Sequence, residues 1–282
     1  MISAPRSSFA STKRRQRLPW PKGQPFRILS LDGGGIKGIF PAALLSIWEQ
    51  RYLDGRSICE CFDSISGTST GGILALGLGA GKTAGEMLQM YMEEGKFIFP
   101  PGWFRRLCLG LRGIALYRYD RAALTQALTS ALRDMKLSAA RVRLCIPAFE
   151  GHHGEVYIFK TPHHPDYKID GHETLVKIGQ ATAAAPSFFS ALDSGGYRFV
   201  DGGIWANNPI MIAITDALAC NKPLCSARVG SGKISSIAIQ LCQFEHRVSF
   251  HSEELHLRCK LTGSFQVSDC QGSISHLCHQ PT

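Results

Sequence analysis

The sequence predicts an α/β fold, because two stretches each have the pattern of a strand, a tight glycine-containing loop and a helix. Residues 26–35, FRILSLDGGG, are an apolar run that ends in glycines, and residues 36–53 carry apolar residues at helical spacing. Residues 61–81 repeat this plan, with a strand to about Ser66, a sharp turn and a helix of small residues. Two such units indicate a sheet with helices packed against it.

The rest of the pattern supports the same class. We expect further helices near residues 84–94, 120–134, 173–184 and 208–219, and further strands at residues 142–150, 155–160 and 197–200. Residues 97–119 mix aromatic residues with arginines. That composition suits a mobile cover or a membrane-contacting surface, because aromatic rings enter the acyl boundary while arginines meet headgroups. A packed loop and helix would fit it equally well.

Composition divides the chain into three parts. Residues 1–25 are basic, and no acidic residue precedes Asp32, so we interpret them as a disordered basic arm. Residues 26–219 hold the clear patterns and are expected to form one domain. Residues 220–282 form a divergent C-terminal segment with weak periodicity, although residues 233–244 still suit a buried strand. This segment is either out of frame or degenerate relative to an ancestral C-terminus, or a variable accessory segment.

Charge and cysteine content limit the expected partners and compartment. The formal net charge of +9 favours an anionic partner such as a lipid surface, nucleic acid or a phosphorylated ligand. A membrane-spanning helix is not expected, because no window of about 18 apolar residues occurs. Ten cysteines without an export signal indicate a reducing compartment. Because Cys59 and Cys61 lack the spacing of a zinc or thioredoxin site, we expect no metal and no redox cofactor.

A candidate nucleophile lies in the second strand–loop–helix unit. Gly67, Ser69 and Gly71 match G-x-S-x-G, the nucleophile-elbow pattern, in which small neighbours let a serine occupy a tight turn between a strand and a helix. The helix N-terminus favours developing negative charge there. The alternative is a serine that merely caps an ordinary helix.

A serine nucleophile needs a base, and Asp201 is the candidate. It follows a β-rich run and precedes Gly202 and Gly203, which keep its surroundings open. Asp-Gly-Gly is also a common turn sequence. The presence of a serine elbow and a glycine loop in the same chain favours the catalytic interpretation.

The glycine loop has two interpretations. Gly33, Gly35 and Gly38 match G-x-G-x-x-G, the phosphate-binding turn of dinucleotide-binding folds. That site also needs an acidic residue about 20 positions further on, at the end of the second strand. Asp54 is near that distance, but it follows a helix pattern and not a strand. No Lys-Ser/Thr pair follows the glycines, which excludes a P-loop. We therefore interpret the loop as an oxyanion hole that uses backbone N–H groups.

These motifs, in this order, resemble those of the patatin-like phospholipases across residues 26 to about 219. The resemblance implies a three-layer α/β/α sandwich with a mainly parallel central sheet, and a Ser-Asp catalytic dyad. Ser69 is then the nucleophile, Asp201 accepts its proton directly, and Gly33, Gly34 and Gly35 form the oxyanion hole. Direct proton transfer requires a partly dehydrated carboxylate with a raised pKa. The supporting motif residues are Asp32, Lys37, Gly38, Gly67, Gly71, Gly202 and Gly203, with Lys37 where the family often has arginine.

Residues 67–87, the IFPP segment and residues 199–211 resemble more narrowly the CapV-type phospholipases of bacterial anti-phage (CBASS) defence. That resemblance implies a cytoplasmic enzyme that acts peripherally at the inner membrane on phospholipids. It also implies a cyclic dinucleotide activator, and no nucleic acid polymer is expected as a partner.

Two other function classes stay open from the sequence. One is an inactive or binding-only relative, which the unusual C-terminal segment suggests. The other is a nucleotide-dependent oxidoreductase that uses the glycine loop. We interpret His152, His153, His163 and His164 as exposed loop histidines, since dyad chemistry does not need them.

Overall fold

The computed structural model describes residues 16–21, 24–98, 119, 121–186, 188–222 and 234–239. Residues 1–15 of the basic arm lie outside the described residues. The same holds for nearly all of the 97–119 segment, since only its first two residues, at the end of a helix, and Tyr119 are described. Our expectations for those parts of the chain stay predictions.

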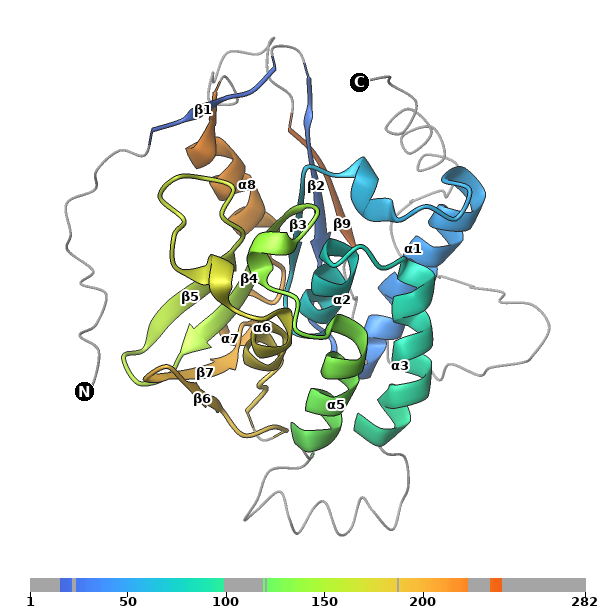
Figure 1. The fold of residues 1–282 in the computed structure, drawn as a ribbon, viewed down its shortest axis with the longest axis vertical. Coiled ribbons are helices and arrows are strands. Elements are labelled where there is room, and N and C mark those ends of the chain that lie inside the picture. The colour runs from blue at the N-terminus through green and yellow to red at the C-terminus, as the bar shows by residue number, and fades with distance from the viewer. Residues whose placement is uncertain are drawn as a thin grey trace, which may run out of the picture.

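The described strands form a seven-stranded sheet and a separate two-stranded one. The parallel part of the large sheet has the order β9-β2-β3-β4 (Figure 1). Its strands are β2 (Phe26–Leu31), β3 (Ser64–Gly67), β4 (Arg143–Glu150) and β9 (Ile234–Ile239). The fold is therefore the predicted α/β class, with β2 and β3 side by side as the two strand–loop–helix units require.

The other side of the sheet is antiparallel. β4 pairs with both β5 and β7, and β7 pairs with β6. These strands are β5 (Glu155–Lys160), β6 (Leu192–Ser194) and β7 (Tyr197–Asp201). Asp201 is the last residue of β7 and lies opposite Ala148 of β4, so the antiparallel pairing brings it toward the end of β3.

Helices cover both faces of the sheet. On one face α8 (Ile210–Cys220) packs against Phe26 and Ile28 of β2. The alternate residues Leu29 and Leu31 face the larger core on the other side. That core is built with α1 (Ile39–Tyr52), α2 (Thr70–Gly79), α3 (Ala84–Ile98), α5 (Arg121–Leu132) and α6 (Leu175–Thr182). The result is a three-layer sandwich.

The small residues of α2 are explained by its place in the centre of the fold. Every residue of α2 is buried. A Cβ on Gly77 would lie 2.2 Å from Met87 Sδ in α3, and one on Gly71 would lie 2.4 Å from the carbonyl oxygen of Leu31 in β2. Side chains at these positions would push the neighbouring elements apart, so the glycines let α2 pack closely on both sides.

Parts of the predicted C-terminal segment belong to this fold. β9 pairs along β2 from Phe26 opposite Ile234 to Leu31 opposite Ile239. β8 (Asn221–Lys222) pairs with β1 (Leu18–Pro19), so a short piece of the predicted basic arm also lies against the domain. The strand expected within residues 233–244 is thus present, while the division of the chain at residue 219 stays a prediction.

Candidate active site

Ser69 has the backbone of a nucleophile elbow. It lies between β3 and α2 with φ 56° and ψ −123°, a conformation that side-chain-bearing residues rarely adopt. A Cβ on Gly67 would lie 2.2 Å from the carbonyl oxygen of Gly71. The predicted glycines flank the serine because the chain passes too close to itself for any side chain.

A threonine that the sequence did not single out supports the elbow. The Ser69 N–H donates to Thr182 Oγ1 at 3.0 Å, and the Thr182 hydroxyl donates to the Pro147 carbonyl at 2.6 Å. Thr182 is fully buried at the end of α6. No local pattern marks this residue, because its role depends on a contact with Ser69 across 113 positions of sequence.

Asp201 meets the serine as predicted. The Ser69 hydroxyl donates to Asp201 Oδ2 at 2.7 Å, and the Gly203 N–H donates to Asp201 Oδ1 at 2.6 Å. Burial raises the pKa of the Asp201 carboxyl above its ordinary value, although these two hydrogen bonds lower it in part. A buried, partly dehydrated carboxylate that accepts a hydrogen bond from a serine hydroxyl is able to act as a general base.

The glycine loop lies against the serine. A Cβ on Gly33 would be 3.2 Å from Ser69 Cβ and 2.6 Å from Asn207 Oδ1. The Gly33 N–H donates to the Asn207 carbonyl at 3.1 Å, whereas the Gly34 N–H makes a longer bond of 3.3 Å to Thr70 Oγ1. Gly34 and Gly35 both line the cavity that contains Ser69. The structure therefore places all three predicted loop glycines beside the serine, with Gly33 already engaged by Asn207.

The supporting motif residues surround this centre. A Cβ on Gly38 would lie 3.0 Å from Thr70 Cβ, and one on Gly202 would lie 2.4 Å from the Pro147 carbonyl oxygen. Asp32 is buried at the end of β2, while Lys37 is exposed in the 3₁₀ turn η1 (Gly35–Gly38). The close approaches show why the motif needs glycine at these two positions.

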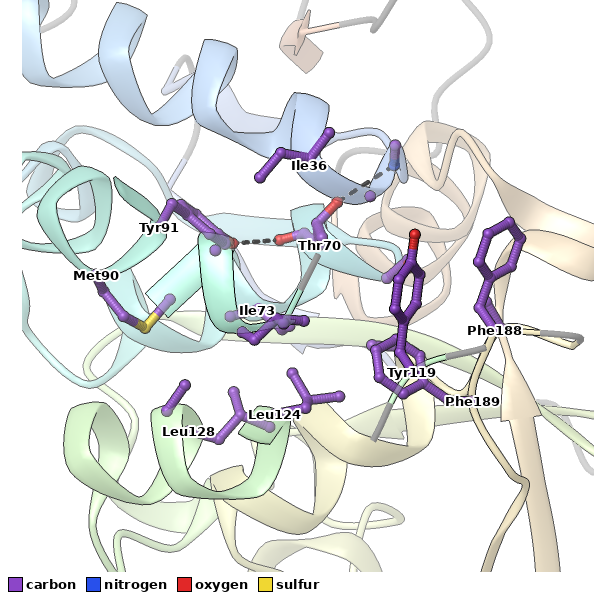
Figure 2. Close-up of a pocket in the computed structure, with 18 residues that line it drawn as sticks. Ile36, Thr70, Ile73, Met90, Tyr91, Tyr119, Leu124, Leu128, Phe188 and Phe189 are labelled. Carbon is purple, nitrogen blue, oxygen red and sulfur yellow. Dashed lines mark hydrogen bonds between the residues drawn. The ribbon is translucent and has the colours of Figure 1, made fainter. Parts of the chain in front are cut away.

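An apolar cavity of about 390 Å³ opens beside Ser69 (Figure 2). Its walls come from α2, α3, α5 and the chain near residues 183–189. Buried apolar side chains line it, among them Ile73, Tyr91, Leu124, Leu128 and Phe189. A cavity of this size and lining suits a flexible hydrocarbon group.

Two lining residues are exposed as well. Ile36 is 45% exposed and Phe188 is 40% exposed, and both line the cavity. They come from different parts of the chain, Ile36 from η1 and Phe188 from the loop before β6 (Figure 2). Lys37, next to Ile36 in sequence, is exposed as well, so exposed apolar side chains of the cavity wall have a cation near one of them.

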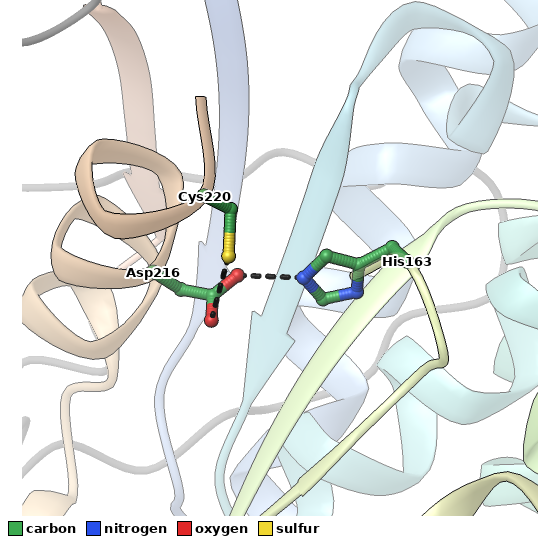
Figure 3. Close-up of side chains that lie close together, drawn as sticks. All are labelled: His163, Asp216 and Cys220. Carbon is green, nitrogen blue, oxygen red and sulfur yellow. Dashed lines mark hydrogen bonds and ion pairs between the residues drawn. The ribbon is translucent and has the colours of Figure 1, made fainter. Parts of the chain in front are cut away.

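A second cluster of polar side chains lies at the other end of the sheet. Asp216 of α8 accepts hydrogen bonds from Lys160 Nζ and His163 Nε2, each at 2.7 Å, and from Tyr167. Cys220 Sγ lies nearby, 4.0 Å from the Asp216 carboxylate (Figure 3). Lys160 pairs with Cys145 near the start of β4, far from the Ala148 end where Asp201 lies.

His163, Asp216 and Cys220 together offer metal-ligand atoms. The Lys160 ammonium, however, already provides the positive charge beside Asp216. Burial of Asp216 opposes its ionisation, but the bonds from His163 and Lys160 outweigh this and hold its pKa well below the ordinary range. We interpret the cluster as a buried ion pair that joins β5 to α8.

Two of the histidines that we expected to be exposed are buried. The His163 side chain is 7% exposed and the His164 side chain 1%, so the prediction of exposed loop histidines is wrong for both. His163 is buried by its hydrogen bond of 2.7 Å to Asp216, and the His164 ring forms a hydrogen bond of 2.6 Å to the Gln16 carbonyl. His152 is exposed as predicted. Polar neighbours in sequence did not reveal that this loop folds back onto α8 and residue 16.

The dinucleotide-binding alternative finds no support in this geometry. Asp54 lies in the turn after α1, with φ 51°, and not at the end of a strand. The second strand ends instead at Gly67 and leads directly to Ser69. A ribose-binding carboxylate is thus missing from the position where such a site requires one.

The fold and the site together define an α/β protein with a nucleophile elbow, in which a serine, a carboxylate and a glycine loop meet beside an apolar cavity. A sequence profile of the patatin-like phospholipases matches residues 29–214. The chain therefore belongs to the patatin-like phospholipase family.

Several curated proteins are similar to this chain. A cGAMP-activated phospholipase of Vibrio cholerae is 35% identical over 75% of this chain and 63% of its own length. One of the same name from Escherichia coli is 36% identical, over 67% of this chain and 55% of its own. Patatin-like protein 2 of Arabidopsis thaliana is 35% identical, over 68% of this chain and 52% of its own length. The narrower resemblance predicted from the sequence is thus confirmed, although the chain spans only 52 to 63% of these relatives.

Proposed function

We propose that this protein is a serine lipid acyl hydrolase that releases fatty acids from membrane phospholipids. The hydrogen bond of 2.7 Å from the Ser69 hydroxyl to Asp201 carries this proposal, because it pairs a nucleophile with its base. Asp201 accepts the hydroxyl proton as Ser69 Oγ attacks the ester carbonyl carbon. The tetrahedral intermediate then collapses, the ester C–O bond breaks, and Asp201 returns the proton to the leaving alkoxide.

Water completes the cycle. Asp201 takes a proton from a water molecule, whose oxygen attacks the acyl carbon on Ser69. The Ser69 ester bond breaks, the proton returns to Ser69 Oγ, and the fatty acid leaves. Neither step requires a metal or a redox cofactor.

The backbone N–H groups of Gly34 and Gly35 stabilise the oxyanion in both steps. Both residues line the cavity beside Ser69, and the α2 N-terminus adds a favourable dipole. Gly33 has a different part in this scheme. Its N–H is bonded to the Asn207 carbonyl, so it anchors the loop and leaves the other two to meet the oxygen.

The apolar cavity supports an acyl chain as the substrate group. A long hydrocarbon chain enters between α3 and α5, with its ester at Ser69. Exposed Ile36 and Phe188 at the open side meet the acyl region of a bilayer, while Lys37 meets anionic headgroups. Across the described residues, no helix combines the length and apolar character needed to cross a membrane. Because of these surface contacts and the CapV-type resemblance, we propose that the protein acts at the surface of the inner membrane, in the cytoplasm.

Activation by a cyclic dinucleotide is part of the proposal. It is supported by two relatives that are named cGAMP-activated phospholipases and are 35 and 36% identical to this chain. An uncontrolled phospholipase would damage the membrane of its own cell, so a resting form that a ligand converts is expected. Moving such an equilibrium from about 1:99 to 99:1 takes roughly 5.5 kcal/mol of differential binding.

Fatty-acid release from phospholipid vesicles tests the proposal. The purified protein is assayed with no nucleotide and with each member of a panel of cyclic dinucleotides that includes cGAMP. We expect release that Ser69→Ala abolishes and that one cyclic dinucleotide increases. Release equal to that of Ser69→Ala under every condition would instead establish an inactive, binding-only relative. Full release without nucleotide would contradict the activation step alone.

A further inference from the structure

Thr70 ties the nucleophile elbow to the glycine loop. It follows Ser69 as the first residue of α2 and is 4% exposed. Its hydroxyl oxygen accepts the Gly34 N–H at 3.3 Å, and its Cβ is 3.0 Å from the position of a Cβ on Gly38 (Figure 2). One side chain therefore lies against the loop at two points, Gly34 just before η1 and Gly38 at its end.

Thr70 is itself held in place. Its carbonyl oxygen accepts a hydrogen bond of 2.7 Å from the Tyr91 hydroxyl of α3. Tyr91 is buried, and its burial raises the pKa of the phenol far above the ordinary range, so the donor is always present at physiological pH. Because Tyr91 of α3 anchors Thr70, the Thr70 side chain can hold the glycine loop in one position.

The Gly34 N–H has to serve a second acceptor during the reaction. A backbone N–H carries one proton, and a strong oxyanion bond requires a donor about 2.7 to 3.1 Å from the oxygen. At 3.3 Å the bond to Thr70 is longer than an ordinary N–H···O bond, so the proton can be shared with a second, charged acceptor. In the resting protein Thr70 Oγ1 thus holds in place the donor that the substrate oxygen later shares.

We propose that the Thr70 hydroxyl is a positioning group: it fixes the Gly34 peptide beside Ser69, so that the Gly34 N–H, still shared with Thr70 Oγ1, can donate to the oxyanion as it forms. This inference rests on the proposed hydrolase function. It assigns Thr70 no proton transfer and no bond to the substrate. Its effect falls on the transition state, because Gly34 donates to the oxygen most strongly when that oxygen bears charge.

Thr70→Val removes the acceptor and keeps the branched shape, while Thr70→Ser keeps the hydroxyl. We expect kcat of the valine protein to fall roughly 10-fold or more with KM within a factor of two, and the serine protein to recover most of it. Binding of a long-chain trifluoromethyl ketone, which forms an oxyanion on the serine, should weaken by the same factor as kcat/KM. Binding of the free fatty acid should not change.

Thr161→Val is the matched control. Thr161 is also buried and also accepts a backbone N–H, from Leu144 at 3.0 Å, but it lies at the end of the sheet opposite Ser69. We expect this variant to lose stability and retain kcat. Thermal unfolding of every variant separates loss of fold from loss of positioning. If the valine protein does not fold, Thr70→Ala replaces it against Thr70→Ser.

Different results would overturn the inference alone or the inference together with the hydrolase function. Wild-type kcat and ketone affinity in Thr70→Val would overturn the inference and leave the hydrolase function standing. Equal loss in Thr70→Val and Thr70→Ser would also overturn it, because the hydroxyl would then not be the group that matters. A wild-type protein no more active than Ser69→Ala, with each cyclic dinucleotide present, would overturn both the function and the inference.

Discussion

The Ser69 hydroxyl donates a hydrogen bond of 2.7 Å to the Asp201 carboxylate, although 132 positions of sequence separate the two residues. Asp201 is the last residue of β7 and Ser69 lies two residues after the end of β3, and β4 lies between these strands in the sheet. The glycine loop after β2 completes the group on the other side of the serine. Three chain segments thus converge at one edge of the sheet.

Removal of either member of this pair should abolish turnover. Ser69→Ala loses the nucleophile, and Asp201→Asn keeps the shape but cannot accept the proton, so we expect fatty-acid release to fall roughly 10⁴-fold in each. Asp193→Asn is the control, because Asp193 is exposed and pairs with Arg198. Activity of Asp201→Asn within a factor of two of wild type would require another base.

The pH dependence of activity should reflect the raised pKa of Asp201. Only the ionised carboxylate accepts a proton, so kcat/KM should rise with pH through a pKa above the ordinary value of 3.8. An acid limb at or below the ordinary aspartate range would contradict this assignment. The limb should disappear from the residual activity of Asp201→Asn.

The same shift predicts how Asp201→Asn changes stability. Because the folded-state pKa of Asp201 is raised, ionisation of this carboxyl destabilises the fold as pH rises through that pKa. Asp201→Asn, which stays neutral and can still accept the Gly203 N–H, should therefore unfold at a higher temperature than wild type near neutral pH. The difference should shrink below the unfolded-state pKa. A less stable amide variant at neutral pH would show that the carboxylate stabilises the site.

Alanine substitutions at two glycines should distinguish the effect of backbone strain from an effect on catalysis. Gly35 and Gly154 have φ of 57° and 71°, and a Cβ on either would meet no atom within 4 Å. Alanine at either position should destabilise the fold by about 1 kcal/mol. Only Gly35→Ala should also lower kcat, by roughly 10-fold or more, because it shifts an oxyanion donor. Equal kcat in the two variants would remove Gly35 from the oxyanion hole.

Filling the cavity should discriminate between chain lengths. Ala127 of α5 is 1% exposed and lines the cavity, so Ala127→Phe occupies space that a long acyl chain needs. We expect hydrolysis of long-chain phospholipid to fall at least 10-fold relative to a short-chain soluble ester, since the chain loses its apolar site. Ala122→Phe, on an exposed part of the same helix, should leave this ratio unchanged. An unchanged ratio in Ala127→Phe would place the acyl chain elsewhere.

Local sequence was sufficient to predict the serine elbow, the glycine loop, Asp201 and most helices and strands. These features depend on neighbouring residues: small residues permit a sharp turn, and the spacing of apolar residues sets the type of element. The apolar stretch within residues 233–244 likewise suited a buried strand, which is β9, even though the surrounding segment has little pattern.

The tertiary structure alone decided which residues meet these motifs. Thr182 holds the elbow across 113 positions, Asn207 engages the glycine loop, and α3 and α5 together enclose the cavity beside Ser69. The burial of His163 against Asp216 likewise depends on a contact between residues distant in the sequence. Each depends on which strands pair and which helix covers which face. Those choices follow from the packing of the whole core, so no local run of residues contains them.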